Sequence, residues 1–235
     1  MSFYGEAIYG LSQYGEGLAM YQSNKIKNLA LMALGFSEEV DFFNDDPDYQ
    51  YRDIIRKVND FYDNSLQSEF SGRYVWNFIM RRDRCVFRQN KTAGKFKYRY
   101  ILRYDSDPES PTYQQGIFNF LALRELYSDP EYRCPITDFE TIGMYVDTDA
   151  DELYVWYMAK IEETLFPEYF VKYFRLRLAS DMCMLLTGDP ELKAQLEMEI
   201  GNARNPGEYA AAKNIDARQN PVRRLDAGPF IGIRR

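Results

Sequence analysis

Histidine, the residue most used for acid–base catalysis and metal binding, is missing from this chain of 235 residues. Without it there is no Ser-His-Asp triad, no imidazole general base and no imidazole metal ligand. The sequence also contains no P-loop, no G-x-G-x-x-G fingerprint and no G-x-S-x-G elbow. We therefore expect no cofactor, no metal and no catalytic residue, and we predict that the protein is not an enzyme.

One aspartate cluster resembles the start of a calcium loop. Asp147, Asp149 and Asp151 have EF-hand spacing, but Glu152 stands where that loop needs glycine and Met158 where it needs glutamate. The flanking residues are typical of strands rather than helices. We interpret the segment as a hairpin turn, with a weak cation site as the alternative.

A second acidic cluster contains Asp45, Asp46 and Asp48, and we interpret it as a solvated loop before a helix. A glycan hydrolase would need two carboxylates across a cleft, one of them with a raised pKa. With 36 carboxylates in the chain, such a pair is not excluded, although no pattern points to one.

Aromatic and basic residues interleave at the start of the middle third, as in proteins that bind single-stranded nucleic acid. The series is Tyr74, Trp76, Phe78, Arg81, Arg82 and Arg84. Because Glu69 and Asp83 flank it, we favour a core strand whose terminal arginines pair with acidic helix residues.

The overall charge and the cysteines restrict the class of protein further. With 29 basic and 36 acidic residues the net charge is −7, which argues against a protein that grips duplex DNA. The three cysteines are 49 residues apart and match no zinc or disulfide framework, so we expect free thiols in a reducing compartment. No signal-peptide pattern occurs, and the longest apolar run, residues 29–34, is too short to span a bilayer. We expect a protein made in the cytoplasm, without a membrane partner.

Helical periodicity at both ends frames a β-rich middle. Helices are predicted over 23–34, 49–70, from 167 to a joint at 187–190, from 190 to about 203, and over 208–217. Strands are predicted over 74–80, 84–88, 96–104, 117–121, 143–146 and 153–158. The predicted fold class is α+β, an antiparallel helical bundle (23–72 and 161–204) with an inserted β-rich region (73–160).

The two ends, 1–22 and 205–235, have the composition of extended arms. Tyr-Gly recurs every five residues in the first arm, where Tyr4, Tyr9 and Tyr14 are candidate contacts to another subunit; a frayed terminus is the alternative. The second arm carries a net charge of +3, which leaves −10 on residues 1–204. Its large apolar residues have no amphipathic period, so we expect them to dock on another protein surface.

The order of several motifs resembles the tail tubular protein A family, the head-to-tail adaptors of short-tailed bacteriophages. The motifs are a capped helix NLALMALG, an acidic turn, a WNF-x-x-R element, a strand leading into LFP, and the helix LRLASDMCMLL followed by the joint TGDP. The resemblance covers residues 24–204, and the Tyr-Gly arm departs from it.

The resemblance implies a virion protein of the neck. Such adaptors form a dodecameric ring between the portal protein and the tail nozzle protein, around a channel through which DNA passes without sequence-specific binding. An acidic body suits such a channel because it repels phosphate. The C-terminal arm is expected to bind the portal, and the arm tyrosines are expected to contact another subunit or the nozzle. The alternative is another neck protein, a head-completion or tail-terminator protein. The portal-binding candidates are Val222, Arg223, Arg224, Leu225, Phe230, Ile231, Ile233, Arg234 and Arg235.

Overall fold

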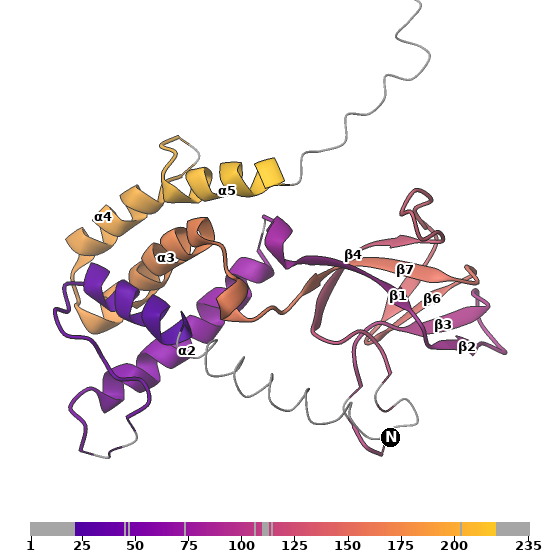
Figure 1. Ribbon diagram of the computed structural model, residues 1–235, viewed down its shortest axis with the longest axis horizontal. Coiled ribbons are helices and arrows are strands. Elements are labelled where there is room, and N and C mark those ends of the chain that lie inside the picture. Colours follow the sequence, from indigo (N-terminus) through magenta and orange to yellow (C-terminus); the bar gives the residue numbers. More distant parts are fainter. Residues whose placement is uncertain are drawn as a thin grey trace, which may run out of the picture. The chain divides into compact units, whose positions relative to one another are not determined.

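The computed structural model describes residues 22–44, 46, 48–72, 74–105, 107–109, 113, 115–202 and 204–219. The predicted α+β class is confirmed, since helices occur together with two antiparallel sheets (Figure 1). The chain divides into two compact units. We call Leu66–Phe166 the strand unit, and Ser23–Ser65 with residues 167–219 the helical unit.

The first helix covers residues 22–33, close to its predicted bounds, and from Ser23 on it belongs to the helical unit. Its buried stripe includes Ile26, Ala30 and Leu31. The Asn28 side chain then fixes the following loop, because it donates to the carbonyl of Val40 at 3.0 Å and accepts from the amide of Val40 at 2.9 Å.

Helix α2 (Arg52–Phe70) carries the longest amphipathic pattern in the sequence. It begins three residues later than predicted, because Tyr49 and Arg52 first make turn hydrogen bonds. Within the helical unit, Tyr62 of α2 packs edge-on against Phe174 at 5.7 Å, and the Ser65 hydroxyl donates to Asp181 at 2.7 Å.

Three helices complete this unit: α3 (Glu168–Leu186), α4 (Pro190–Ile200) and α5 (Glu208–Gln219). The predicted joint is confirmed, because the Asp189 side chain accepts from the amides of Glu191 and Leu192 and so caps α4. Both α4 and α5 pack against α3 (Figure 1). Helix α3 is the core of the unit, with side chains buried along most of its length.

The strand unit contains two sheets. The three-stranded sheet has the order β1 (Met80–Cys85), β7 (Leu153–Ala159), β4 (Phe120–Tyr127). The four-stranded sheet has the order β2 (Arg88–Asn90), β3 (Tyr98–Ile101), β6 (Tyr145–Thr148), β5 (Glu140–Ile142). Every strand pair is antiparallel.

One apolar core joins the two sheets. Tyr100 and Val146 enter it from the four-stranded sheet, and Leu126, Leu153 and Val155 from the three-stranded sheet. Strand β7 alternates strictly between buried and half-buried residues. Its two faces are therefore chemically different, one lying in the core and the other carrying side chains outward.

Several predicted strands differ from the structure. Residues 74–76 have no regular structure, and Asn77–Ile79 forms a 3-10 turn, so the strand predicted over 74–80 is wrong. The alternating aromatic residues there pack on one another: Trp76 is fully buried and lies 4.8 Å from Tyr74, centroid to centroid. The strand begins at Met80, later than predicted, and β4 runs on to Tyr127. Strand β5 was not predicted.

The interpretation of Asp147–Glu152 as a hairpin turn is also wrong. Strand β6 belongs to the four-stranded sheet and β7 to the three-stranded sheet, so the segment crosses between sheets. The hairpin in this region is formed by β5 and β6 instead, with Gly143 at φ +61° in its turn. Within the described residues, no helix is both long and apolar enough to cross a membrane.

Candidate interaction surface

The outward face of the three-stranded sheet combines arginines with aromatic rings. Arg82 and Arg84 of β1 lie opposite Trp156 and Tyr154 of β7 in the strand register. These positions alternate with core positions such as Val155, so their side chains leave the sheet on the side away from the core. We define the arginine–aromatic face as Arg82, Arg84, Tyr127, Tyr132, Tyr154 and Trp156.

Arg82 contacts two aromatic rings. Its guanidinium carbon is 4.8 Å from the ring centre of Tyr132 and 5.3 Å from that of Trp156. These two cation–π contacts hold the guanidinium in place. Among the described residues, no carboxylate lies within ion-pair distance of it, so its N–H groups are available to an acceptor on another molecule.

Arg84 is held by a different set of contacts. Its Nη2 lies 2.7 Å from Oε1 of Glu152, and its guanidinium carbon is 5.8 Å from the ring centre of Tyr154. The Tyr154 hydroxyl donates to the other oxygen of Glu152 at 2.9 Å, and this hydrogen bond raises the pKa of Tyr154. Arg84 is therefore largely neutralised within the face, whereas Arg82 is not.

Tyr132 reaches the face from a tightly closed loop. The Asp129 carboxylate accepts from the amides of Arg133 and Cys134 at 2.9 and 2.6 Å, and the hydrogen bond from Arg133 lowers the pKa of Asp129. Within this loop Tyr132 has φ +57°, a left-handed conformation that is costly for a bulky residue. The conformation places its ring 5.2 Å from that of Tyr127 and 6.1 Å from that of Tyr154.

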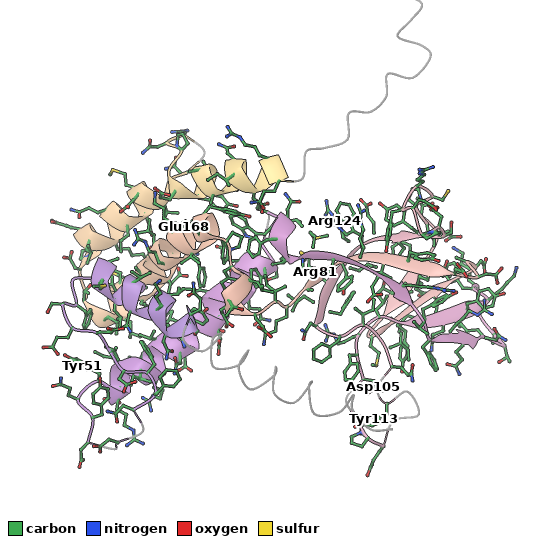
Figure 2. The ribbon with its side chains drawn as sticks, in the orientation of Figure 1. Tyr51, Arg81, Asp105, Tyr113, Arg124 and Glu168 are labelled. Carbon is green, nitrogen blue, oxygen red and sulfur yellow. The ribbon has the colours of Figure 1, made fainter. Side chains whose placement is uncertain are left out.

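Strand β4 forms the other edge of the face and is irregular. Its pairing with β7 shifts between Phe120 and Ala122, and again between Leu123 and Glu125. The second shift leaves Arg124 as the extra residue, exposed to solvent (Figure 2). The neighbouring Glu125 accepts from the Tyr127 hydroxyl, and burial raises the pKa of Tyr127 to about 12.

The calcium-like aspartates have another role in the structure. The Asp147 side chain is fully buried and is paired with Arg99 and Lys91. Hydrogen bonds from Arg99 lower the pKa of Asp147 to about 2. Asp149 accepts from the amide of Lys97, and Asp151 lies 3.4 Å from Arg88. Among the described residues, no three His, Cys, Asp or Glu side chains gather into a metal-binding group.

The sequence prediction for the arginines needs correction. Arg84 pairs with Glu152 in the segment between β6 and β7, not with an acidic helix residue, and Arg82 contacts rings. Arg81 donates to the carbonyls of Phe78 and Met80, both at 2.9 Å (Figure 2). Arg82 and Arg84 also lie within a strand rather than beyond its end.

Other candidates of the sequence stay untested by the structure. The arm residues Tyr4, Tyr9 and Tyr14 and the portal-binding candidates within 222–235 lie outside the described residues.

In the acidic loop, the side chains of Asn44 and Asp46 accept from backbone amides two residues ahead. Of the three cysteines, Cys85 and Cys183 are buried and Cys134 is exposed, each as a free thiol. Burial raises the pKa of Cys85 to about 12.

The arginine–aromatic face is suited to binding another macromolecule. Tyr, Trp and Arg are the residue types that dominate binding energy at protein interfaces. Glu125 and Glu152 lie within the same face and reduce its attraction for phosphate. The alternation of β7 was the signal for this face in the sequence. Tyr132 gave no such signal, because it lies in a loop.

No protein-family model matches the chain, and no curated protein matches it.

Proposed function

We propose that this chain is a structural protein of the virion, a head-to-tail adaptor of a short-tailed bacteriophage. In this proposal, copies form a ring, expected to be dodecameric, between the portal and the tail nozzle, and DNA leaves the capsid through it. The protein has no catalytic role. It is made in the host cytoplasm and ends in the neck of the particle.

The observation that carries the proposal is the contact between two motifs of the resemblance. Phe78 of the WNF element and Phe166 of the LFP element are 88 positions apart, yet their ring centres are 6.1 Å apart. Phe70 at the end of α2 packs edge-on against both, at 6.3 and 5.9 Å. Two motifs that are weak individually therefore pack against each other, as expected if they belong to one common fold.

The surface chemistry also supports an assembly protein. A closed ring uses heterologous interfaces, in which one patch of a subunit meets a different patch on its neighbour. The arginine–aromatic face provides one such patch in the strand unit. In the helical unit, α2 contacts α3 while α4 and α5 lie along α3, and we propose an antiparallel bundle there. Its exposed apolar side chains include Met184, Leu185 and Met198.

The hydrolase alternative is not supported by the two carboxyl groups of the described residues whose pKa values are clearly shifted. A general acid of that class needs a raised pKa. The pKa values of Asp129 and Asp147 are lowered instead, because both carboxylates accept several hydrogen bonds. Another neck component, a head-completion or tail-terminator protein, would share the interaction surface and differ in its partners.

The direct test is assembly with the portal. The purified chain is mixed with the portal and with the nozzle of its phage, and native mass spectrometry measures which complexes form. We expect a portal complex with a fixed number of copies. Failure to bind either partner, with binding to another neck protein, would favour the alternative.

Two variants identify the contribution of the C-terminal arm. The first deletes residues 222–235, and the second changes Phe230, Ile231 and Ile233 to Ser while it keeps the arginines. Both should fold as judged by circular dichroism, and both should lose portal binding if the apolar residues dock. Full binding by both variants would remove the arm from the proposal.

A further inference from the structure

The helical unit contains a groove unrelated to the arginine–aromatic face. Its volume is about 440 Å³, within the range of roughly 300–1,000 Å³ that is typical of binding sites. Leu29 and Met32 of the first helix, Leu176 of α3, and Leu192 and Leu196 of α4 provide the apolar part of the lining. Met32 is 59% exposed at this groove.

Two charged residues line the groove as well, Arg175 of α3 and Glu199 of α4. The Nε of Arg175 is buried and has no hydrogen-bond partner among the described residues. A buried donor without an acceptor is costly, so an occupant that brings a carboxylate would be favoured. Glu199 is exposed and, within the described part of the chain, has no basic side chain at ion-pair distance.

These features fit a segment of the chain itself. Residues 220–235 read NPVRRLDAGPFIGIRR, in which Leu225 has two arginines on one side and Asp226 on the other. The groove lining offers the complementary groups, namely a carboxylate, apolar side chains and a guanidinium. The described residues end at Gln219, the last residue of α5, and α5 packs on α3 and α4, which line the groove. Sixteen extended residues span up to about 50 Å, well beyond the radius of gyration of about 13 Å expected for a compact unit of about 100 residues.

We propose that the groove formed by residues 22–33, α3 and α4 binds residues 220–235, supplied by the same chain or by a neighbouring copy. Leu225 and Phe230 lie against the apolar lining. Asp226 accepts hydrogen bonds from the Arg175 guanidinium, and Arg223 and Arg224 pair with Glu199. Neither the groove nor this pairing depends on portal binding, so the inference goes beyond the proposed function. Where residues 220–235 bind both the groove and the portal, these two sites compete for the segment.

Photo-crosslinking of the full-length chain tests the proposal. Benzoylphenylalanine replaces Phe230, the protein is irradiated, and mass spectrometry identifies the crosslinked peptides. We expect crosslinks to peptides that contain Met32 or Leu192–Glu199. A mixture of light and isotopically heavy protein shows whether the contact lies within one chain or between copies, and either result supports the proposal. Crosslinks that avoid these peptides would overturn it.

Charge variants in the same background make the test specific. Glu199→Arg should lower the yield of groove crosslinks about fivefold, because it repels Arg223 and Arg224. Glu197→Arg makes the same charge change on α4 outside the groove lining and should leave the yield unchanged. Combining Glu199→Arg with Arg223→Glu and Arg224→Glu should restore it. Equal yields for the Glu199 and Glu197 variants would contradict the pairing. Portal binding, measured separately, can fail or succeed independently of these outcomes.

Discussion

Arg99 on β3 and Asp147 on β6 form a bidentate ion pair across neighbouring strands. The Nε and Nη2 of Arg99 donate to Oδ1 and Oδ2 of Asp147 at 2.8 and 2.9 Å. Lys91, just after β2, donates to the same carboxylate. The carboxylate is fully buried beneath these two side chains, so one residue connects β6 with β3 and with the end of β2.

The first prediction concerns acid stability. The pKa of Asp147 is about 2 in the folded protein and near 3.8 in an unfolded chain. A lowered pKa stabilises the fold fully above about pH 4, and this contribution of about 2 kcal/mol is lost as the pH falls through 2. Urea unfolding of the wild type and Asp147→Asn should therefore show a difference in free energy that shrinks between pH 6 and 2.5. A difference that does not change with pH would contradict the assignment.

The second prediction separates the attraction within the ion pair from the cost of burying its charges. Asp147→Asn leaves two cations without their carboxylate and should cost about 3 kcal/mol at pH 7. The triple variant Lys91→Met, Arg99→Met and Asp147→Leu removes all three charges and should lose less than half as much. Glu152→Gln, in the exposed pair with Arg84, is the control and should cost less than about 1 kcal/mol. Denaturant titration measures all three, and a triple variant as unstable as Asp147→Asn would refute this account.

The third prediction concerns the turn between α4 and α5. Gly201 has φ +90°, and a Cβ there would lie 2.2 Å from the backbone nitrogen of Gly207. Gly201→Ala should therefore cost about 3 kcal/mol, from strain and from displaced backbone. Gly188 has φ +67° with nothing within 4 Å of a Cβ, so Gly188→Ala should cost about 1 kcal/mol. Thermal unfolding compares them, and equal costs would show that the close approach is absent in solution.

Local signals explain which elements the sequence predicts. The helix joint was predicted because Gly188, Asp189 and Pro190 act on their own backbone, independently of distant residues. The fully alternating β7 was predicted for the same reason, since one face enters the core. The predictions for the middle third of the chain are wrong where contacts between distant residues determine the local structure. Trp76 and Phe78 alternate like strand residues, yet they pack into an aromatic cluster with Phe70 and Phe166.

The candidate site was only partly predictable. The arginines are conspicuous in the sequence because of their number. The two ring partners of Arg82, however, come from β7 and from the loop that contains Tyr132, about 50 residues away or more. The hairpin interpretation of Asp147–Glu152 failed for a related reason. Local turn propensity is the same for a hairpin and for a crossing between sheets. The strand pairing distinguishes them, because both edges of β6 are taken by β3 and β5, and both edges of β7 by β1 and β4.

The fourth prediction concerns the conformation of Tyr132. Both Tyr132→Ala and Tyr132→Gly remove the ring from Arg82, but only glycine adopts φ +57° without strain. The glycine variant should therefore be as stable as the alanine variant or more stable. The expected difference in the free energy of unfolding is up to about 1 kcal/mol. In an ordinary loop position the order is reversed, because glycine increases the entropy of the unfolded chain. Chemical denaturation of the two variants gives the answer, and a clearly more stable alanine variant would exclude the left-handed conformation.

The fifth prediction tests the arginine–aromatic face as an interface. Trp156 is half-buried on the central strand β7, and the Arg82 guanidinium carbon is 5.3 Å from its ring centre. Trp and Arg residues near the centre of protein interfaces carry most of the binding energy. We expect Trp156→Ala and Arg82→Ala each to weaken assembly into the portal complex at least tenfold. Arg82→Lys should restore little, because an ammonium lacks the planar surface through which a guanidinium contacts aromatic rings.

The matched control for this last prediction is Arg81→Ala. It removes the same charge from the neighbouring position of β1, where the side chain donates to the carbonyls of Phe78 and Met80 instead of entering the face. Native mass spectrometry of each variant with the portal measures assembly, and circular dichroism shows whether each variant is folded. If Arg81→Ala weakens assembly as much as Arg82→Ala, net charge and not the ring contacts of Arg82 governs binding. If neither folded variant of the face differs from the wild type, the interface lies elsewhere on the molecule.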